Sequence, residues 1–169
     1  MCKIPHMRKI TQKYYIAGTD VGVGVFAKIP IKKNEVILKF KGRKINSEFT
    51  EKRNKKVKKY RWGDFLQIGN NKYINIEKPG VLVNHSCNPN AGIKNDKILI
   101  AIKNIYIDEE IRYDYSTTMD EDDWTMKCRC HQKNCRKIIK DFKYLPKTAR
   151  EKYLKLGIVQ NFIARKFEK

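Results

Sequence analysis

Short runs of β-branched and aromatic residues, separated by polar turn formers, follow one another between residues 13 and 115. Runs of this length and composition are typical of β-strands. The Gly69-Asn70-Asn71 sequence predicts a tight hairpin, because glycine and asparagine tolerate the positive φ angles of such turns. The pattern therefore predicts a mainly β domain. Its candidate strands are Tyr14–Ala17, Gly24–Ile29, Glu35–Lys39, Phe65–Ile68, Lys72–Ile76, Ile98–Ile102 and Ile111–Asp114.

Helical spacing occurs in two places. Residues 47–60 read as one helix within the β-rich region. A second helix is predicted to begin at Pro146 and to end at Gly157, because proline favours the first turn of a helix and glycine its end. Its apolar positions, Leu145, Ala149, Tyr153 and Leu156, recur at nearly four-residue spacing and predict a buried face.

The composition is that of one globular domain with a strong positive charge. The chain has 169 residues, and its formal net charge is +20. This charge favours polyanionic partners such as nucleic acid or nucleosomes, and much of it lies between Lys41 and Arg61. Such a run is either a docking surface or a solvated helix face.

The first fifteen residues contain four basic side chains and no continuous apolar stretch. This pattern predicts neither a secretory signal nor a membrane anchor, and we expect the protein to be cytoplasmic where it is made. In a reducing compartment, cysteines are thiols or metal ligands more often than disulfides.

Three cysteines lie close together between Cys128 and Cys135. A structural zinc site needs four thiolate or imidazole ligands, so these three require a fourth ligand from elsewhere. Cys87 and Cys2 are the remaining thiols, and Cys87 is favoured because it stands in a polar, turn-forming stretch. His131 is a competing ligand, and disulfide pairing is the alternative explanation of the cluster.

Two further patterns carry little information alone. The Gly22-Val23-Gly24 sequence permits a close backbone approach to a ligand, but it lacks the third glycine and following helix of a dinucleotide fingerprint. Tyr113 and Tyr115 alternate in the stretch from Ile111 to Tyr115 and should project from the same side of an extended chain, where aromatic residues usually belong to the core.

Taken together and in this order, the motifs resemble those of SET-domain methyltransferases with a post-SET zinc segment, most closely small stand-alone microbial ones. The resemblance extends from Tyr14 to Cys135. Besides the glycine pair, the motifs are Asn84-His85-Ser86-Cys87-x-Pro89-Asn90, Glu109-Glu110-x-x-Tyr113-Asp114-Tyr115 and Cys128-x-Cys130-x4-Cys135.

The resemblance implies a mainly β SET-domain fold of several small sheets with a threaded, pseudoknot C-terminal segment. It places the SET domain at residues 10–118 with a helical insert at 46–62. A post-SET zinc segment at 119–136 and a C-terminal helical tail at 137–169 would follow.

The resemblance also implies the site residues and the reaction. The chain would be a protein-lysine N-methyltransferase that uses S-adenosylmethionine and binds one structural zinc ion. Tyr115 would be the catalytic tyrosine, and a tyrosine at Tyr113 is similar to enzymes that stop after one methyl group. The cofactor-binding residues would be Val21, Gly22, Val23, Gly24, Asn84, His85 and Tyr115. The zinc ligands would be Cys87, Cys128, Cys130 and Cys135, with His131 standing where glycine is common.

This sequence departs from the family pattern in three respects. Val81-Leu82-Val83 replaces the Arg-Phe-Ile that many relatives carry before the asparagine–histidine pair. A tyrosine that often touches the cofactor has only Tyr60 and Trp62 as nearby candidates, and no separate pre-SET cysteine cluster exists. These departures affect the details of the cofactor pocket rather than the fold.

The expected partner is a lysine-containing basic protein: a histone tail, a ribosomal protein or a small chromatin protein. The acidic run from Asp120 to Asp123 could attract any of these, while residues 41–61, if they form a docking surface, would contact nucleic acid or a nucleosome. The protein would act on chromatin in its own cell or after export to a host nucleus. The rival hypotheses are a zinc-stabilised nucleic-acid-binding protein without activity and a SET-like module that binds peptides without catalysis.

Overall fold

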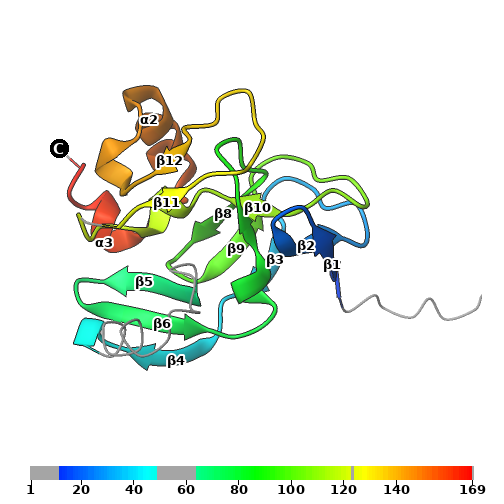
Figure 1. The fold of residues 1–169 in the computed structure, drawn as a ribbon, viewed down its shortest axis with the longest axis horizontal. Coiled ribbons are helices and arrows are strands. Elements are labelled where there is room, and N and C mark those ends of the chain that lie inside the picture. The colour runs from blue at the N-terminus through cyan, green and yellow to red at the C-terminus, as the bar shows by residue number, and fades with distance from the viewer. Residues whose placement is uncertain (1–11, 49–63, 123, 169) are drawn as a thin grey trace, which may run out of the picture.

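A computed structural model describes residues 12–48, 64–122 and 124–168. Within these ranges the chain forms five small β-sheets of two or three strands, with short helices gathered near the C-terminus (Figure 1). The expected mainly β fold is therefore confirmed. Of the helix predicted at 47–60, Ser47 and Glu48 are helical, and the rest lies outside the described residues.

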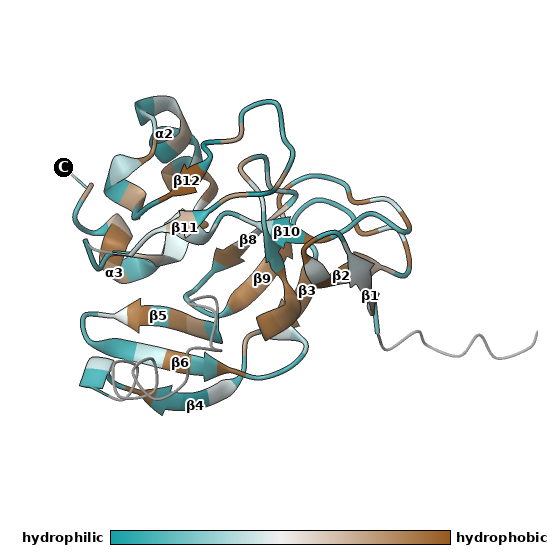
Figure 2. Cartoon of the chain, viewed as in Figure 1, coloured by the Kyte–Doolittle hydropathy of each residue, from teal (hydrophilic) through white to brown (hydrophobic). Residues whose placement is uncertain are grey.

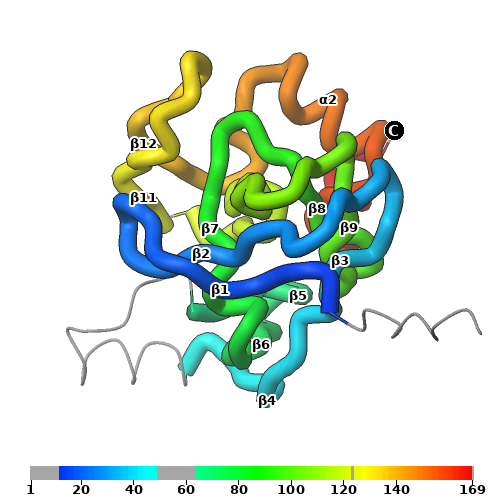
Figure 3. The backbone as a smooth tube through the Cα atoms, turned by 90° about the vertical axis from the view of Figure 1, so that its right-hand side faces the viewer, coloured from blue at the N-terminus to red at the C-terminus, as the bar shows by residue number. Residues whose placement is uncertain are grey.

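The N-terminal hairpin consists of β1 (Tyr14–Thr19) and β2 (Gly22–Ala27), which pair antiparallel along their whole length. Viewed from the side, this hairpin lies across β7 (Asn84–His85) (Figure 3). β7 in turn pairs in parallel with β10 (Arg112–Tyr113), a strand of the later motif. Three motifs that are distant in sequence therefore meet at one place.

Two three-stranded sheets form the body of the domain. The strand orders are β3-β9-β8 and β4-β6-β5, with antiparallel neighbours. The predicted hairpin joins β5 to β6, and Asn71 has the expected positive φ of 54°. The strands are β3 (Val36–Lys39), β4 (Gly42–Ile45), β5 (Phe65–Gly69), β6 (Lys72–Ile76), β8 (Ala91–Lys94) and β9 (Ile98–Ala101).

Strand β4 was not predicted, because it lies in the basic run and lacks a clear alternation of apolar residues. Its first residue, Gly42, has a φ of +151°, and a Cβ there would lie 1.9 Å from the carbonyl oxygen of Asn75. Only glycine permits this close pairing with β6. The backbone therefore forms a strand that the pattern of side chains does not predict.

The main core fills the space between these sheets. Figure 2 shows hydrophobic residues along β5, β8 and β9, three of the strands that contribute to this core. Side chains from seven strands and from the loops between them contribute to one cluster, and its largest fully buried members are Ile31, Phe40, Leu66, Ile74, Ile93, Leu99, Ile105 and Ile111.

The C-terminal tail forms α2 (Lys147–Leu156) and α3 (Asn161–Ala164). As predicted, Pro146 precedes the first turn of α2, and Gly157 ends the helix in the left-handed conformation with φ +63°. No helix in the described part of the chain is long and apolar enough to cross a membrane.

A second core attaches this tail to the sheet of β3, β8 and β9. It contains Ile100 of β9 together with Phe142, Tyr153 and Ile158. Gly92 of β8 lies against the tail so closely that a Cβ there would be 2.7 Å from the Cβ of Ile158. The tail is thus part of the folded domain.

Replacing Ile158, which is 1% exposed, by alanine should leave a cavity between the tail and β8. We expect Ile158→Ala to lower the free energy of unfolding by about 2–5 kcal/mol, measured by urea denaturation. Ile138→Ala is the control, because Ile138 is 43% exposed and its loss should cost about 0.5 kcal/mol or less. Equal midpoints for the two variants would show that the tail is not docked in solution.

Candidate active site and cysteine cluster

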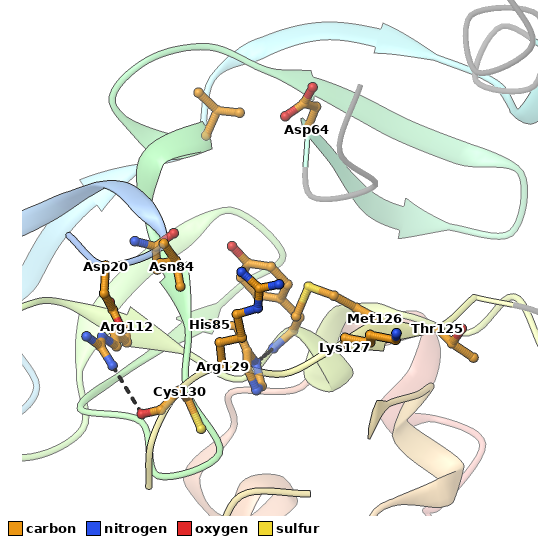
Figure 4. A pocket seen from close by; sticks show the side chains of 13 residues that line it. Asp20, Asp64, Asn84, His85, Arg112, Thr125, Met126, Lys127, Arg129 and Cys130 are labelled. Carbon is orange, nitrogen blue, oxygen red and sulfur yellow. Dashed lines mark hydrogen bonds between the residues drawn. The ribbon is translucent and has the colours of Figure 1, made fainter. Parts of the chain in front are cut away.

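A cavity of about 470 Å³ opens where the hairpin turn, β7, the residues after β10 and the segment 125–130 meet. Figure 4 shows Asp20 and Asn84 on one side of this cavity and Thr125 and Met126 on the other. Cavities that hold small ligands have volumes of about 300–1,000 Å³. The space is therefore large enough for a cofactor-sized molecule.

Gly24, the second glycine of the pair, packs the hairpin against the wall of this cavity. A Cβ on Gly24 would lie 2.6 Å from Oε1 of Glu110 and 3.1 Å from Nδ2 of Asn84. The Asn84 amide donates hydrogen bonds to the carbonyl oxygen of Val23 at 3.1 Å and to Oε1 of Glu110 at 2.8 Å. The absence of a side chain at Gly24 thus lets the backbone of β2 approach Glu110 and Asn84, which are held by their hydrogen bonds.

Glu110 is a site residue that the sequence analysis did not single out. Its side chain is 8% exposed and is paired with Arg112 as well as with Asn84. Its place in the Glu-Glu-x-x-Tyr-Asp-Tyr motif was the signal that could have revealed it. A carboxylate that is buried beside the site needs hydrogen-bonding partners, and these partners are then fixed by it. Glu110 holds Asn84 and the hairpin in one arrangement.

His85 connects the cavity wall to the cysteine cluster. Its Nδ1 accepts a hydrogen bond from the backbone N–H of Tyr115 at 3.2 Å, and its Nε2 lies 3.4 Å from Sγ of Cys87. Burial lowers the pKa of His85 to about 4, although Asp114 acts in the opposite direction. The imidazole is therefore neutral near pH 7.

The two tyrosines lie together, as their spacing predicted, although for another reason. Strand β10 ends at Tyr113, and Tyr115 begins the 3-10 helix η3 (Tyr115–Thr118). The ring centroids are 4.9 Å apart, and the hydroxyl of Tyr115 donates a hydrogen bond to the carbonyl oxygen of Val83 at 2.9 Å. Burial holds the pKa of Tyr113 well above its usual value, so this phenol stays protonated.

The cysteine cluster brings Cys87 of the polar loop to the C-terminal cysteines. Donor atoms of His85, Cys87, Cys128 and Cys130 all lie within 4.8 Å of one another. Cys135 interacts with Cys128 but stands outside this mutually close group. Each of these four cysteines is a free thiol, and the sulfurs of Cys87 and Cys128 are 3.8 Å apart, whereas a disulfide needs about 2 Å.

Burial disfavours the thiolate form in most of this cluster. Burial raises the pKa of Cys87 to about 11 and raises that of Cys128 further. At Cys130 burial acts in the same direction, but hydrogen bonds from the backbone N–H groups of Cys87 and Gln132 help to lower the pKa to about 7. A dication would replace the protons of these thiols, and the donor set of three sulfurs and one imidazole fits a zinc-type ion.

His131 does not join the cluster. Its side chain is 74% exposed, and Nε2 lies 3.0 Å from Oδ2 of Asp20 on the hairpin turn. Of the basic run, Lys41 to Glu48 is described and includes β4, while residues 49–63 lie outside the described part. The cofactor candidates Tyr60 and Trp62 lie in that range as well.

Comparison with known proteins identifies the fold. The family model described as "SET domain" matches residues 22–116. The chain is 28% identical over 151 residues to a Drosophila melanogaster protein named histone-lysine N-methyltransferase trr, covering 80% of this chain and 6% of that protein. It is 29% identical over 126 residues to an Emericella nidulans protein named histone-lysine N-methyltransferase, H3 lysine-4 specific, covering 67% and 10%. The chain thus spans a small part of these relatives.

A solved structure has a similar fold. One match is a humanized mutant of the Chaetomium thermophilum Polycomb Repressive Complex 2 bound to the inhibitor GSK126. The TM-score is 0.55 at 18% sequence identity, covering 65% of this chain and 16% of that one. Since the family model matches more than half of the sequence, and the sheets, motif order and structural neighbour agree with it, this chain belongs to the SET-domain family.

Proposed function

We propose that this protein is a protein-lysine N-methyltransferase that moves a methyl group from S-adenosylmethionine to the ε-amine of lysine in a basic protein. The observation that carries the proposal is the position of Tyr115. Its ring lines the cavity formed by the hairpin turn, Asn84 and His85, and its hydroxyl is fixed by the carbonyl oxygen of Val83. The names of the relatives support a histone-like substrate.

The cavity would hold S-adenosylmethionine, which supplies an electrophilic methyl group on a sulfonium. The turn from Val21 to Gly24 presents backbone atoms at close range, because Gly24 lacks a side chain. Asn84 and His85 would contact the cofactor from β7, and Tyr115, whose ring packs against His85, would contact it from the start of η3. The donors and acceptors of this wall are fixed by Glu110 before any ligand binds.

Methyl transfer requires a neutral amine, whereas a free lysine has a pKa of about 10.4. An apolar channel and a nearby sulfonium both lower that pKa. Because the Tyr115 hydroxyl directs its proton to Val83, its oxygen lone pairs remain available to the amine and the methyl group. Tyr113 lies beside Tyr115 and would narrow the space in which a methylated amine can turn.

We propose that zinc is held by Cys87, Cys128, Cys130 and Cys135. A ring nitrogen of His85 lies within 4.8 Å of three of these sulfurs, but its Nδ1 accepts the Tyr115 N–H. In the neutral ring the proton then lies on Nε2, which has no lone pair left for a metal. Cys135, which already interacts with Cys128, is the better fourth ligand.

We propose the same division into domains as the sequence suggested, with chromatin as the place of action. Residues 41–61 would contact nucleic acid through their charge. The acidic run from Asp120 to Asp123 would attract a basic substrate less strongly than its composition suggests. Asp120 is paired with Lys166, and Asp122 with Lys143, so part of its charge is neutralised within the chain.

Replacing Tyr115 by phenylalanine removes the hydroxyl and keeps the ring. We expect Tyr115→Phe to reduce methyl transfer to histones or lysate proteins by about a hundredfold or more, measured with labelled S-adenosylmethionine. Stability should fall by only about 1 kcal/mol, the value of one hydrogen bond. The control is Tyr106→Phe at a residue that is 72% exposed. Full activity of the Tyr115 variant would remove this residue from the mechanism.

The second tyrosine should decide how many methyl groups are added. We expect the wild-type protein to produce monomethyl-lysine, and Tyr113→Phe to shift the product towards dimethyl-lysine, because the loss of a buried hydroxyl creates room at the amine. Mass spectrometry of the modified peptide distinguishes the products. Trimethyl-lysine as the main wild-type product would contradict this prediction.

The cysteine cluster predicts one bound metal ion. Elemental analysis of the folded protein should return about one zinc per chain, since four ligands complete one tetrahedral site. Chelation should weaken the binding of S-adenosylmethionine, measured by calorimetry, because the segment 125–130 lines the cavity beside the cluster. A folded protein that contains no zinc would refute the four-cysteine site.

A further inference from the structure

The carboxylate of Asp114 joins three segments of the chain. Its side chain is 0% exposed. Arg136 donates from Nη1 to Oδ2 at 2.6 Å and from Nη2 to Oδ1 at 2.7 Å, and the hydroxyl of Tyr153 donates to Oδ2 at 3.2 Å. A bidentate guanidinium and a phenol thus satisfy a charge that burial would otherwise disfavour.

Asp114 also fixes the start of the turn that carries Tyr115. Its Oδ1 accepts the backbone N–H of Ser116 at 3.1 Å, and its carbonyl oxygen accepts that of Thr117 at 3.0 Å. These bonds satisfy the first donors of the 3-10 helix η3, as an N-terminal cap does. A movement of the carboxylate would therefore move the backbone that positions Tyr115.

Arg136 connects this carboxylate to the cysteine cluster. It directly follows Cys135, and its backbone N–H lies 3.4 Å from Sγ of Cys87. The same sulfur lies 3.4 Å from Nε2 of His85, whose Nδ1 accepts the Tyr115 N–H. Two paths therefore run from Cys87 to the turn, one through Arg136 and Asp114 and the other through His85.

The C-terminal tail supplies the third connection, from beyond the residues that the family model matches. Tyr153 lies in α2 and is 3% exposed. The backbone N–H of Gln160, between α2 and α3, donates to the carbonyl oxygen of Thr117 at 3.0 Å. The tail thus contacts both ends of the turn that begins at Tyr115.

We infer that Arg136 and Tyr153 are positioning residues, which act through Asp114 to make the placement of Tyr115 depend on the folded cysteine segment and the docked tail. This inference rests on the proposed methyl transfer. Buried ion pairs add little net stability compared with apolar residues, and they can serve to select one arrangement. Here the arrangement selected is that of the Tyr115–Thr118 turn.

The test uses Arg136→Lys and Tyr153→Phe in the full-length protein. Lysine keeps the charge but loses the bidentate geometry, and phenylalanine keeps the packing but loses the hydrogen bond. We expect kcat to fall by about ten- to a hundredfold for Arg136→Lys and less for Tyr153→Phe, as a misplaced catalytic group would cause. KM for S-adenosylmethionine should change much less than kcat. Amide hydrogen exchange at 115–118 should accelerate in both variants.

Arg150→Lys is the matched control. Arg150 lies in α2 and donates to the carbonyl oxygens of Lys143 and Leu145 without contacting Asp114. In the Arg150→Lys variant, amide hydrogen exchange at residues 115–118 and kcat should equal those of the wild type. Zinc content and thermal midpoint, measured for all variants, separate a displaced turn from a lost fold.

Unchanged exchange at 115–118 and unchanged kcat in both test variants would overturn the inference. If Arg136→Lys fails to fold, the inference is tested by Tyr153→Phe alone, through hydrogen exchange at 115–118 and kcat. Absence of methyl transfer in the wild type would refute the proposed function, while hydrogen exchange would still report whether Asp114 holds the turn. The two failures are therefore distinguishable.

Discussion

The turn from Asp114 to Thr118 follows a strand of only two residues, so no extended ladder of sheet hydrogen bonds holds it in place. Its position depends on the buried carboxylate of Asp114 and on the Tyr115 N–H, which find partners in the cysteine segment, the C-terminal tail and β7. Each partner comes from a segment more than twenty residues away. Contacts from all three segments therefore hold the turn in the folded protein.

The wall of the cavity formed by the hairpin and β7 depends on close packing around the buried carboxylate of Glu110. Gly24 admits Glu110 and Asn84 to distances that any side chain would prevent. The Asn84 amide then links the hairpin to β7 by hydrogen bonds to Val23 and Glu110. The side chains of Asn84 and Glu110 are therefore already ordered, and a ligand would not have to order them on binding.

The protonation of the cysteine cluster is linked to the position of the Asp114–Thr118 turn. Burial favours the protonated thiols at Cys87 and Cys128, so that binding of a dication would release protons and organise the segment from 128 to 135. That segment ends at Arg136, whose side chain reaches Asp114. A metal held by the cluster would therefore be connected to the turn of Tyr115 through Arg136 and Asp114.

The sequence by itself determined the strands of regular composition, the hairpin at Asn71, the helix between Pro146 and Gly157, and the motifs that identify the family. These features depend on local propensities and on residue types at fixed spacing, which a linear sequence contains. It did not reveal β4, which forms because Gly42 permits a close backbone contact, nor the role of Glu110. Only the tertiary structure decided that Asp114, Arg136 and Tyr153 share one buried site, because their contact depends on how distant segments pack.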